Sequence, residues 1–199
     1  MTTGGKLLIA GGLLLALGVG LVVGFAGGVL VTKAGRTFLA GLVESERPAQ
    51  VARPQTLARE QFQLQYPGNW KLDREDEDFD PDHAFNIESP GSAFIMFHIG
   101  KATLEPDAAL EQQVAAFSKL MDRPAQAHFS RWGGFTGQGV VLRGRVLGIP
   151  TTIKPFVFSR DGQSVIVVQY YPDEDQAAVL PGLQLVERTF ALRPAHAQP

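Results

Sequence analysis

The sequence predicts an α+β domain that follows one N-terminal transmembrane helix, and three observations lead to this class. Residues 7–31 contain no charged or polar side chain. From residue 61 onward, short segments with a two-residue apolar period alternate with Pro and Gly turns, as in a half-buried sheet. Residues 106–121 change to a helical period. We therefore expect six or seven strands in a mainly antiparallel sheet, with helices packed on it.

The apolar run is long enough to cross a bilayer. As a helix its 25 residues extend about 37 Å, and the hydrocarbon core of a membrane is about 30 Å thick. A cleaved signal peptide is the alternative, because Lys6 precedes the run and Gly24-Phe25-Ala26 suits a peptidase. However, the apolar core of a signal peptide has only about 7–15 residues. We expect an uncleaved transmembrane anchor over residues 1–33.

Small residues recur at every fourth position of this anchor, at Ala16, Gly20, Gly24 and Gly28. On a helix this spacing forms one stripe, along which a second helix approaches closely. The alternative is that glycine is simply common in membrane helices. We expect the stripe to be a helix-packing interface with other subunits of a membrane complex.

Composition divides the remaining chain into three parts. Residues 34–59, with two prolines and little apolar periodicity, predict a linker. Residues 60–192 predict the folded domain, and residues 193–199 a disordered tail. The folded domain carries eleven Lys/Arg and eighteen Asp/Glu, whereas residues 1–59 carry six Lys/Arg and two Glu. An acidic domain disfavours nucleic acid as a partner, because phosphate binding needs clustered cations. The chain has no cysteine, which excludes disulfides and thiolate metal sites.

Turn signals separate the expected strands. The strands are residues 61–66, 84–88, 92–99, 137–147, 151–160 and 164–171, with residues 127–132 as one further candidate. Residues 70–72 resume the extended structure after the first strand. The Asp161-Gly162 pair between the last two is a strong hairpin signal. A helix over residues 106–121 begins at Pro106, a favoured first helical position. A short helical piece at residues 173–180 and a closing helix at residues 183–192 complete the domain.

The order of these elements resembles the PsbP-like family, named after the extrinsic subunit of the photosynthetic oxygen-evolving complex, which also includes bacterial envelope proteins of the DcrB type. The resemblance spans residues 60–192. The residues that carry it are Phe62-x-Leu64-x-Tyr66-Pro67-x-x-Trp70-Lys71, then Ser89-Pro90-Gly91-Ser92-Ala93, Leu110 in the helix, the Gly148-Ile149-Pro150 turn, the Asp161-Gly162 hairpin and Thr189-Phe190. It implies an α-β-α sandwich and a mostly non-enzymatic role at a membrane complex, in the thylakoid lumen or the periplasm.

Seven carboxylates crowd into residues 73–82, and this segment is the most unusual of the domain. The alternating residues Asp76, Asp78, Asp80 and Asp82, followed by His83, are candidate metal ligands. The segment departs from a calcium-binding loop, because Pro81 replaces the glycine that such a loop requires. A solvated loop and a docking patch for a basic partner are the other interpretations.

Two further sets of residues allow two interpretations each. His98, in the apolar strand, could join His83 and Asp80 or Asp82 in a metal site, or simply be packed. Arg143 and Arg145 share one strand face, and with Arg131 and Arg160 they could line one exposed stripe or pair with acids across strands.

The sequence predicts no enzyme and no cofactor. It contains no Gly-x-Ser-x-Gly elbow, no P-loop and no dinucleotide-binding glycine motif. We expect a single-pass, membrane-anchored, non-enzymatic accessory or assembly subunit of a photosynthetic or respiratory complex, bound through both its helix and its domain. A free-standing envelope protein that binds a metal ion or small ligand is the alternative.

Two features of the sequence disagree about the side of the membrane on which the folded domain lies. Lys33 and Arg36 after the anchor outnumber Lys6 before it, which favours a cytoplasmic domain. The family resemblance implies a domain outside the cytoplasm, and a charge imbalance this small is weak. We expect the inner membrane, with the domain in the periplasm and the cytoplasm as the alternative.

Overall fold

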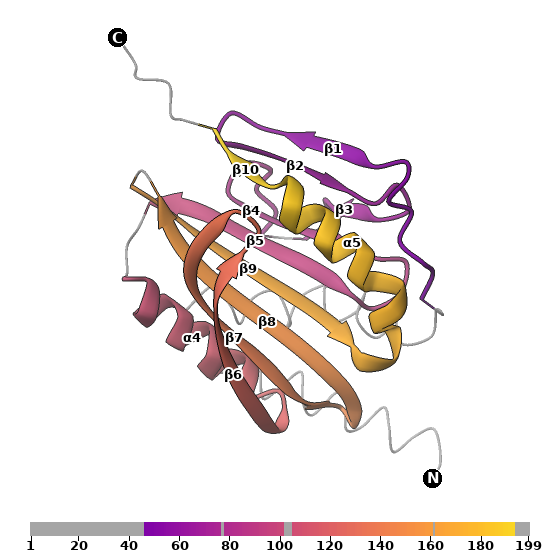
Figure 1. The fold of residues 1–199 in the computed structure, drawn as a ribbon, viewed down its shortest axis with the longest axis vertical. Helices are drawn as coiled ribbons and strands as arrows, with labels where there is room; N and C mark the ends of the chain where they lie inside the picture. The colour runs from indigo at the N-terminus through magenta and orange to yellow at the C-terminus, as the bar shows by residue number, and fades with distance from the viewer. Residues whose placement is uncertain (1–45, 77, 102–104, 161, 194–199) are drawn as a thin grey trace.

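The computed structural model describes residues 46–76, 78–101, 105–160 and 162–193 (Figure 1). The predicted anchor, residues 34–45 of the predicted linker and residues 194–199 of the tail lie outside them. In the part of the chain that is described, no helix is long and apolar enough to cross a membrane.

A seven-stranded antiparallel sheet forms the centre of the domain, with the strand order β3-β4-β5-β9-β8-β7-β6. Its strands are β3 (Lys71–Asp73), β4 (Ala84–Glu88), β5 (Phe94–Lys101), β6 (Asp122–Trp132), β7 (Phe135–Val146), β8 (Ile149–Arg160) and β9 (Gln163–Pro172). After β5 the chain passes through a helix to the edge strand β6 and returns by successive hairpins, until β9 pairs with β5. The predicted α+β class with a mainly antiparallel sheet is confirmed.

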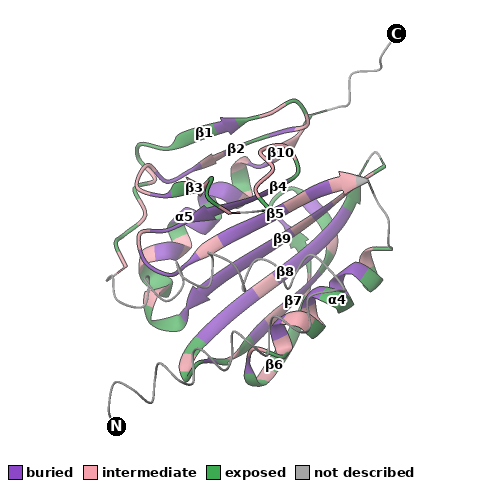
Figure 2. Cartoon of the chain, turned by 180° about the vertical axis from the view of Figure 1, so that it is seen from behind, coloured by how far each residue is buried: buried purple, intermediate pink, exposed green. Residues whose placement is uncertain are grey.

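A smaller sheet and two helices cover the large sheet. The small sheet has the order β1-β2-β10, formed by β1 (Gln55–Ala58), β2 (Phe62–Tyr66) and β10 (Ala191–Leu192). The helices are α4 (Pro106–Ser118) and α5 (Gln176–Thr189), the latter preceded by the 3-10 turn η1 (Asp173–Asp175). Helix α5 and the small sheet lie on the face turned to the viewer in Figure 1, and α4 lies on the face seen in Figure 2.

Alternating side chains of the large sheet build one hydrophobic core on each face. In β5, Ile95, Phe97 and Ile99 belong to the core beneath α5, whereas Met96 belongs to the core beneath α4. This division follows from the two-residue period of a strand. The strand β4 is buried along its whole length.

Phe190 joins the layers on the α5 side. Its ring contacts Phe62 of β2, Phe97 of β5, Trp132 of β6, Phe135 of β7 and Phe158 of β8, with centroid separations of 5.2–6.4 Å. We call these six rings the Phe190 cluster. Stacked and edge-on aromatic pairs at such separations stabilise a core beyond the area that they bury.

The structure differs from the sequence prediction at the C-terminal helix. The predicted break at Pro181 is absent, and one helix runs from Gln176 to Thr189 with this proline inside it. A Cβ atom on Gly182 would lie 2.7 Å from the Trp70 ring, so the helix approaches that ring closely. Tertiary packing therefore outweighs the local preference of Pro-Gly to end a helix.

The N-terminal boundary and the last residues also differ. Residues 55–58, which the sequence places in the linker, form β1 because they pair with residues 63–66 of β2. Residues 191–192, predicted as helical, form β10 on the other side of β2. Both strands are too short to show a period of their own.

The Phe190 cluster generates a stability prediction. Replacing Phe190 with Ala is expected to lower the free energy of unfolding by about 3–5 kcal/mol, because the cavity would open among five other rings. Gln184→Ala, on the exposed side of the same helix, is the control and should change it by less than about 0.5 kcal/mol. Urea denaturation of both variants measures this, and equal midpoints would contradict a central role for the cluster.

Candidate functional site

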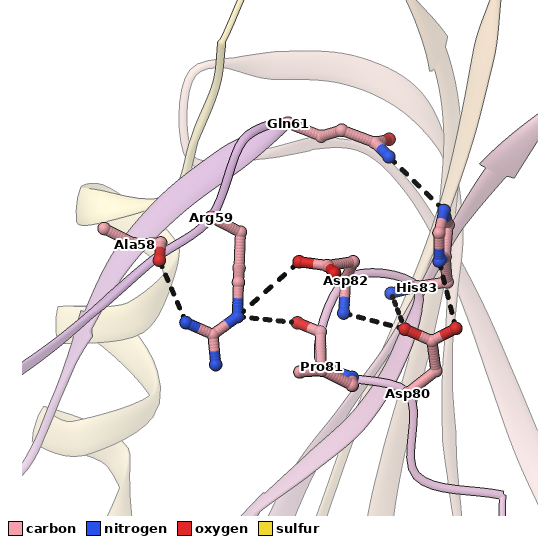
Figure 3. Close-up of polar contacts among 7 residues, drawn as sticks. All are labelled: Ala58, Arg59, Gln61, Asp80, Pro81, Asp82 and His83. Carbon is pink, nitrogen blue, oxygen red and sulfur yellow. Dashed lines mark hydrogen bonds and ion pairs between the residues drawn. The ribbon is translucent and has the colours of Figure 1, made fainter.

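Three segments that are far apart in sequence meet at one end of the large sheet. Gln61 lies between β1 and β2, and its Nε2 atom is 3.3 Å from the Nε2 atom of His83. Gln163, at the start of β9, donates from Nε2 to Gln61 Oε1 over 2.6 Å. Arg59 donates from Nε to the Pro81 carbonyl over 3.2 Å (Figure 3). We call this end, which holds residues 59–61 and 73–83, the acidic end.

The aspartates of the acidic end hold the backbone turns of their own loop. Three aspartates accept a backbone N–H through their Oδ1 atoms, over 2.9–3.0 Å. The pairs are Asp73 with Glu75, Asp76 with Asp78, and Asp80 with Asp82. Each is a side chain bonded to the backbone two residues further on, as in an Asx-turn. Asp73, Asp76 and Asp80 therefore have a structural role in their own loop.

Asp80 and His83 form the closest pair of candidate ligands. His83 Nδ1 lies 3.1 Å from Asp80 Oδ2, and the side chains are 47% and 49% exposed. The N–H of Asp82 bonded to Asp80 lowers the pKa of that carboxyl, and the His83 side chain lowers it further, although slight desolvation opposes them. Asp80 therefore stays charged at neutral pH, facing a half-exposed imidazole.

The other candidate ligands point to different partners. Asp82 lies 3.6 Å from the guanidinium of Arg59. Asp76 accepts from the Asn86 side chain through Oδ2 over 3.0 Å. Among the described residues, which exclude Glu77 of this loop, no three His, Asp or Glu side chains are grouped to hold a metal ion. Of the five predicted ligands, the structure joins Asp80 with His83.

His98 lies on β5, next to the acidic end. It is paired across the sheet with Ala84, the residue after His83. Its side chain is half-buried, and burial lowers the pKa of its imidazole, with the nearby His83 lowering it further. A neutral His98 packed in the sheet fits this environment.

The strand register places Arg143 and Arg160 of the predicted stripe near opposite ends of β8. Arg143 of β7 is paired with Thr152 near the start of β8, whereas Arg160 is the last residue of that strand. Eight residues of strand correspond to about 27 Å. The ring of Phe135 lies under the Arg160 guanidinium, 6.0 Å from its centroid. The single-stripe interpretation is therefore wrong.

The sequence reasoning missed two charged residues of the sheet, of which Glu88 is buried and Lys154 is half-buried. Glu88 is 8% exposed, and burial raises the pKa of its carboxyl although Lys71 Nζ lies 3.3 Å away. Burial lowers the pKa of the Lys154 ammonium, which lies 5.3 Å from the centroid of the Phe129 ring. Neither position carries a local sequence signal, because their burial results from pairing between distant strands.

The helix-packing residues Ala16, Gly20, Gly24 and Gly28 lie outside the described part of the chain. The predicted interface in the membrane stays a prediction.

The comparisons with known proteins concern the fold. No family model matches the chain, and no curated protein matches its sequence. Among solved structures, LpqN, involved in cell envelope biogenesis of Mycobacterium tuberculosis, is 13% identical with a TM-score of 0.46, covering 71% of this chain and 91% of its own. Cyanobacterial PsbP (CyanoP) from Synechocystis sp. PCC 6803 is 12% identical with a TM-score of 0.48, covering 76% and 99%. At such values the function must be argued from the residues of this chain.

The acidic end generates a prediction that separates structural from cation-binding aspartates. Asp80→Asn keeps the acceptor for the Asp82 N–H and should change the free energy of unfolding by less than about 0.5 kcal/mol. Asp80→Ala removes it and should lower that free energy by about 1 kcal/mol. Thermal melts with and without millimolar calcium provide the measurement. A melting temperature of the parent that rises with calcium, and does not rise in Asp80→Asn, would establish a cation site instead.

Proposed function

We propose that this chain is a single-pass, membrane-anchored, non-enzymatic accessory subunit of a larger membrane complex, of the photosynthetic or respiratory type. The observation that carries the proposal is the uncharged run of residues 7–31 in front of a folded β domain. The run has the length of a spanning helix, and its small residues at every fourth position form a face on which another helix packs. A tether that only holds a domain at the membrane does not need such a face.

The arrangement of the domain suits a subunit that contacts its partner at a distance from the anchor. The described chain begins beside the turn before β5, where the Ser89 hydroxyl donates to the Glu46 carboxylate. The acidic end lies beyond the other end of that strand, where Ala84 pairs with His98. The length of β5 separates the two by about 20–25 Å. Carboxylates held in place by backbone turns are preorganised, which favours docking on a basic surface of a partner.

The proposed location is the inner membrane, with the domain in the periplasm. A long domain is translocated largely regardless of its charge, so Lys33 and Arg36 do not prevent this orientation. If the domain lies in the cytoplasm instead, the basic surface of the partner belongs to the cytoplasmic face of the complex.

A second candidate function is a free-standing envelope protein that binds a metal ion or small ligand. The pairing of Asp80 with His83 at 3.1 Å favours it, since a carboxylate and an imidazole are common ligands of divalent transition metals. It requires further ligands to move toward this pair, because Asp76 and Asp82 have other partners.

Extraction in mild detergent tests the first function directly. The full chain is expected to co-purify with other membrane subunits, and Gly24→Leu should reduce their recovery severalfold, because a leucine widens the face that a partner helix approaches. The variant should still insert, since the segment stays apolar. Val22→Leu, on the opposite side of the helix, is the control and should leave recovery unchanged. Isolation of the parent as a lone monomer, or equal recovery from Gly24→Leu, would speak against this function.

A further inference from the structure

A leucine stands exposed at the tip of the β7–β8 hairpin. Val146 pairs with Ile149, so the turn consists of Leu147 and Gly148 alone. Both have positive φ, 53° and 85°, as the two central residues of a type I′ turn require. Asn, Asp or Gly suits the first of these positions, whereas a leucine there is strained. Leu147 is 43% exposed, and among the described residues it is the one large hydrophobic residue that is exposed.

Two arginines of β7 precede the exposed Leu147. Arg143 and Arg145 of β7 are exposed, and within the described residues neither lies within ion-pair distance of a carboxylate. Arg145 donates from Nη1 to the Gly148 carbonyl over 2.9 Å, which holds its guanidinium at the turn. An apolar side chain flanked by cations is the composition that enters the headgroup layer of an anionic membrane.

Acidic groups lie nearby, at or behind the level of Arg145. Asp122 is opposite Arg145 on β6. Asp173, Glu174 and Asp175 follow the end of β9, whose last residue, Pro172, pairs with Thr151. The hairpin continues past that pair by two residues of each strand before it turns, which corresponds to about 7 Å. A flat surface that approaches this end therefore meets Leu147 first, then Arg145 and Asp122 at one level, and the carboxylates after β9 last.

The tip also lies at the end of the sheet where the chain arrives from the proposed anchor. Ala49 donates its N–H to the carbonyl of Ala178, in the first turn of α5, and only the 3-10 turn η1 separates α5 from the end of β9. Residues 32–45 separate the apolar run from the first described residue, and these 14 residues reach at most about 50 Å when extended. The bilayer is therefore within reach of the hairpin.

From these four observations we infer that the β7–β8 hairpin inserts Leu147 into the headgroup layer of an anionic lipid bilayer, with Arg145 on a lipid phosphate. The inference rests on the proposed function, because the anchor brings this end to the membrane. It adds a second contact to the tether and turns the acidic end away from the bilayer.

The absence of cysteine from the chain allows a clean test with single-cysteine variants. Full-length Leu147→Cys and Ser159→Cys are labelled with the fluorophore NBD and reconstituted into nanodiscs that contain phosphatidylglycerol and a lipid with a nitroxide near the headgroup. Ser159 is exposed near the opposite end of β8 and is the matched control. The label at 147 should be quenched at least twofold more than the label at 159. Arg145→Gln should reduce that quenching, as should neutral lipid.

Three results would overturn the inference in distinguishable ways. Weak and equal quenching of both labels, in a chain that co-elutes with the nanodiscs, refutes the hairpin contact and leaves the proposed function intact. A chain that does not co-elute with the nanodiscs refutes the anchor and the hairpin contact together. A label at 147 that shifts to the blue only after co-purified subunits are added assigns the tip to a protein partner instead of lipid.

Discussion

The packing of Phe190 is the interaction on which the rest of the structure depends. This one side chain, at the junction of α5 and β10, contacts rings from the small sheet and from several strands on one face of the large sheet. The small sheet is too small to be stable alone, since isolated pairings of four and two residues bury little apolar area. The Phe190 cluster provides that area, and so it holds β1, β2 and the loop after them over the large sheet.

The two surfaces considered for function follow from this arrangement. The turn between β1 and β2 supplies Arg59 and Gln61, which bond the acidic loop, so the position of that loop depends on the packed small sheet. The β7–β8 hairpin lies beyond the other end of the central strands. The long antiparallel strands thus separate a carboxylate-rich end from an end with an exposed leucine and two arginines. In the proposed function, one end faces a protein partner and the other faces lipid.

Much of the fold could be predicted from local patterns, because alternation, proline and glycine act over a few residues. The strand β4 matched its predicted bounds, and α4 began at Pro106 as predicted. Features set by contacts between distant segments could not be predicted. The helix passes Pro181 because Gly182 packs on Trp70, and Arg143 and Arg160 are far apart because of the strand register. The candidate ligands were chosen by residue type, which does not reveal that Asp73, Asp76 and Asp80 bond their own backbone.

The central claim is that a folded β domain is held at a membrane by residues 7–31, and alkaline extraction tests it most directly. Membranes that contain the full chain are washed with carbonate at high pH, which removes proteins bound only at the surface, and are then sedimented. The chain is expected to remain in the membrane pellet, because a spanning helix of this length is released only by detergent. Recovery of the intact, full-length chain in the supernatant would contradict it.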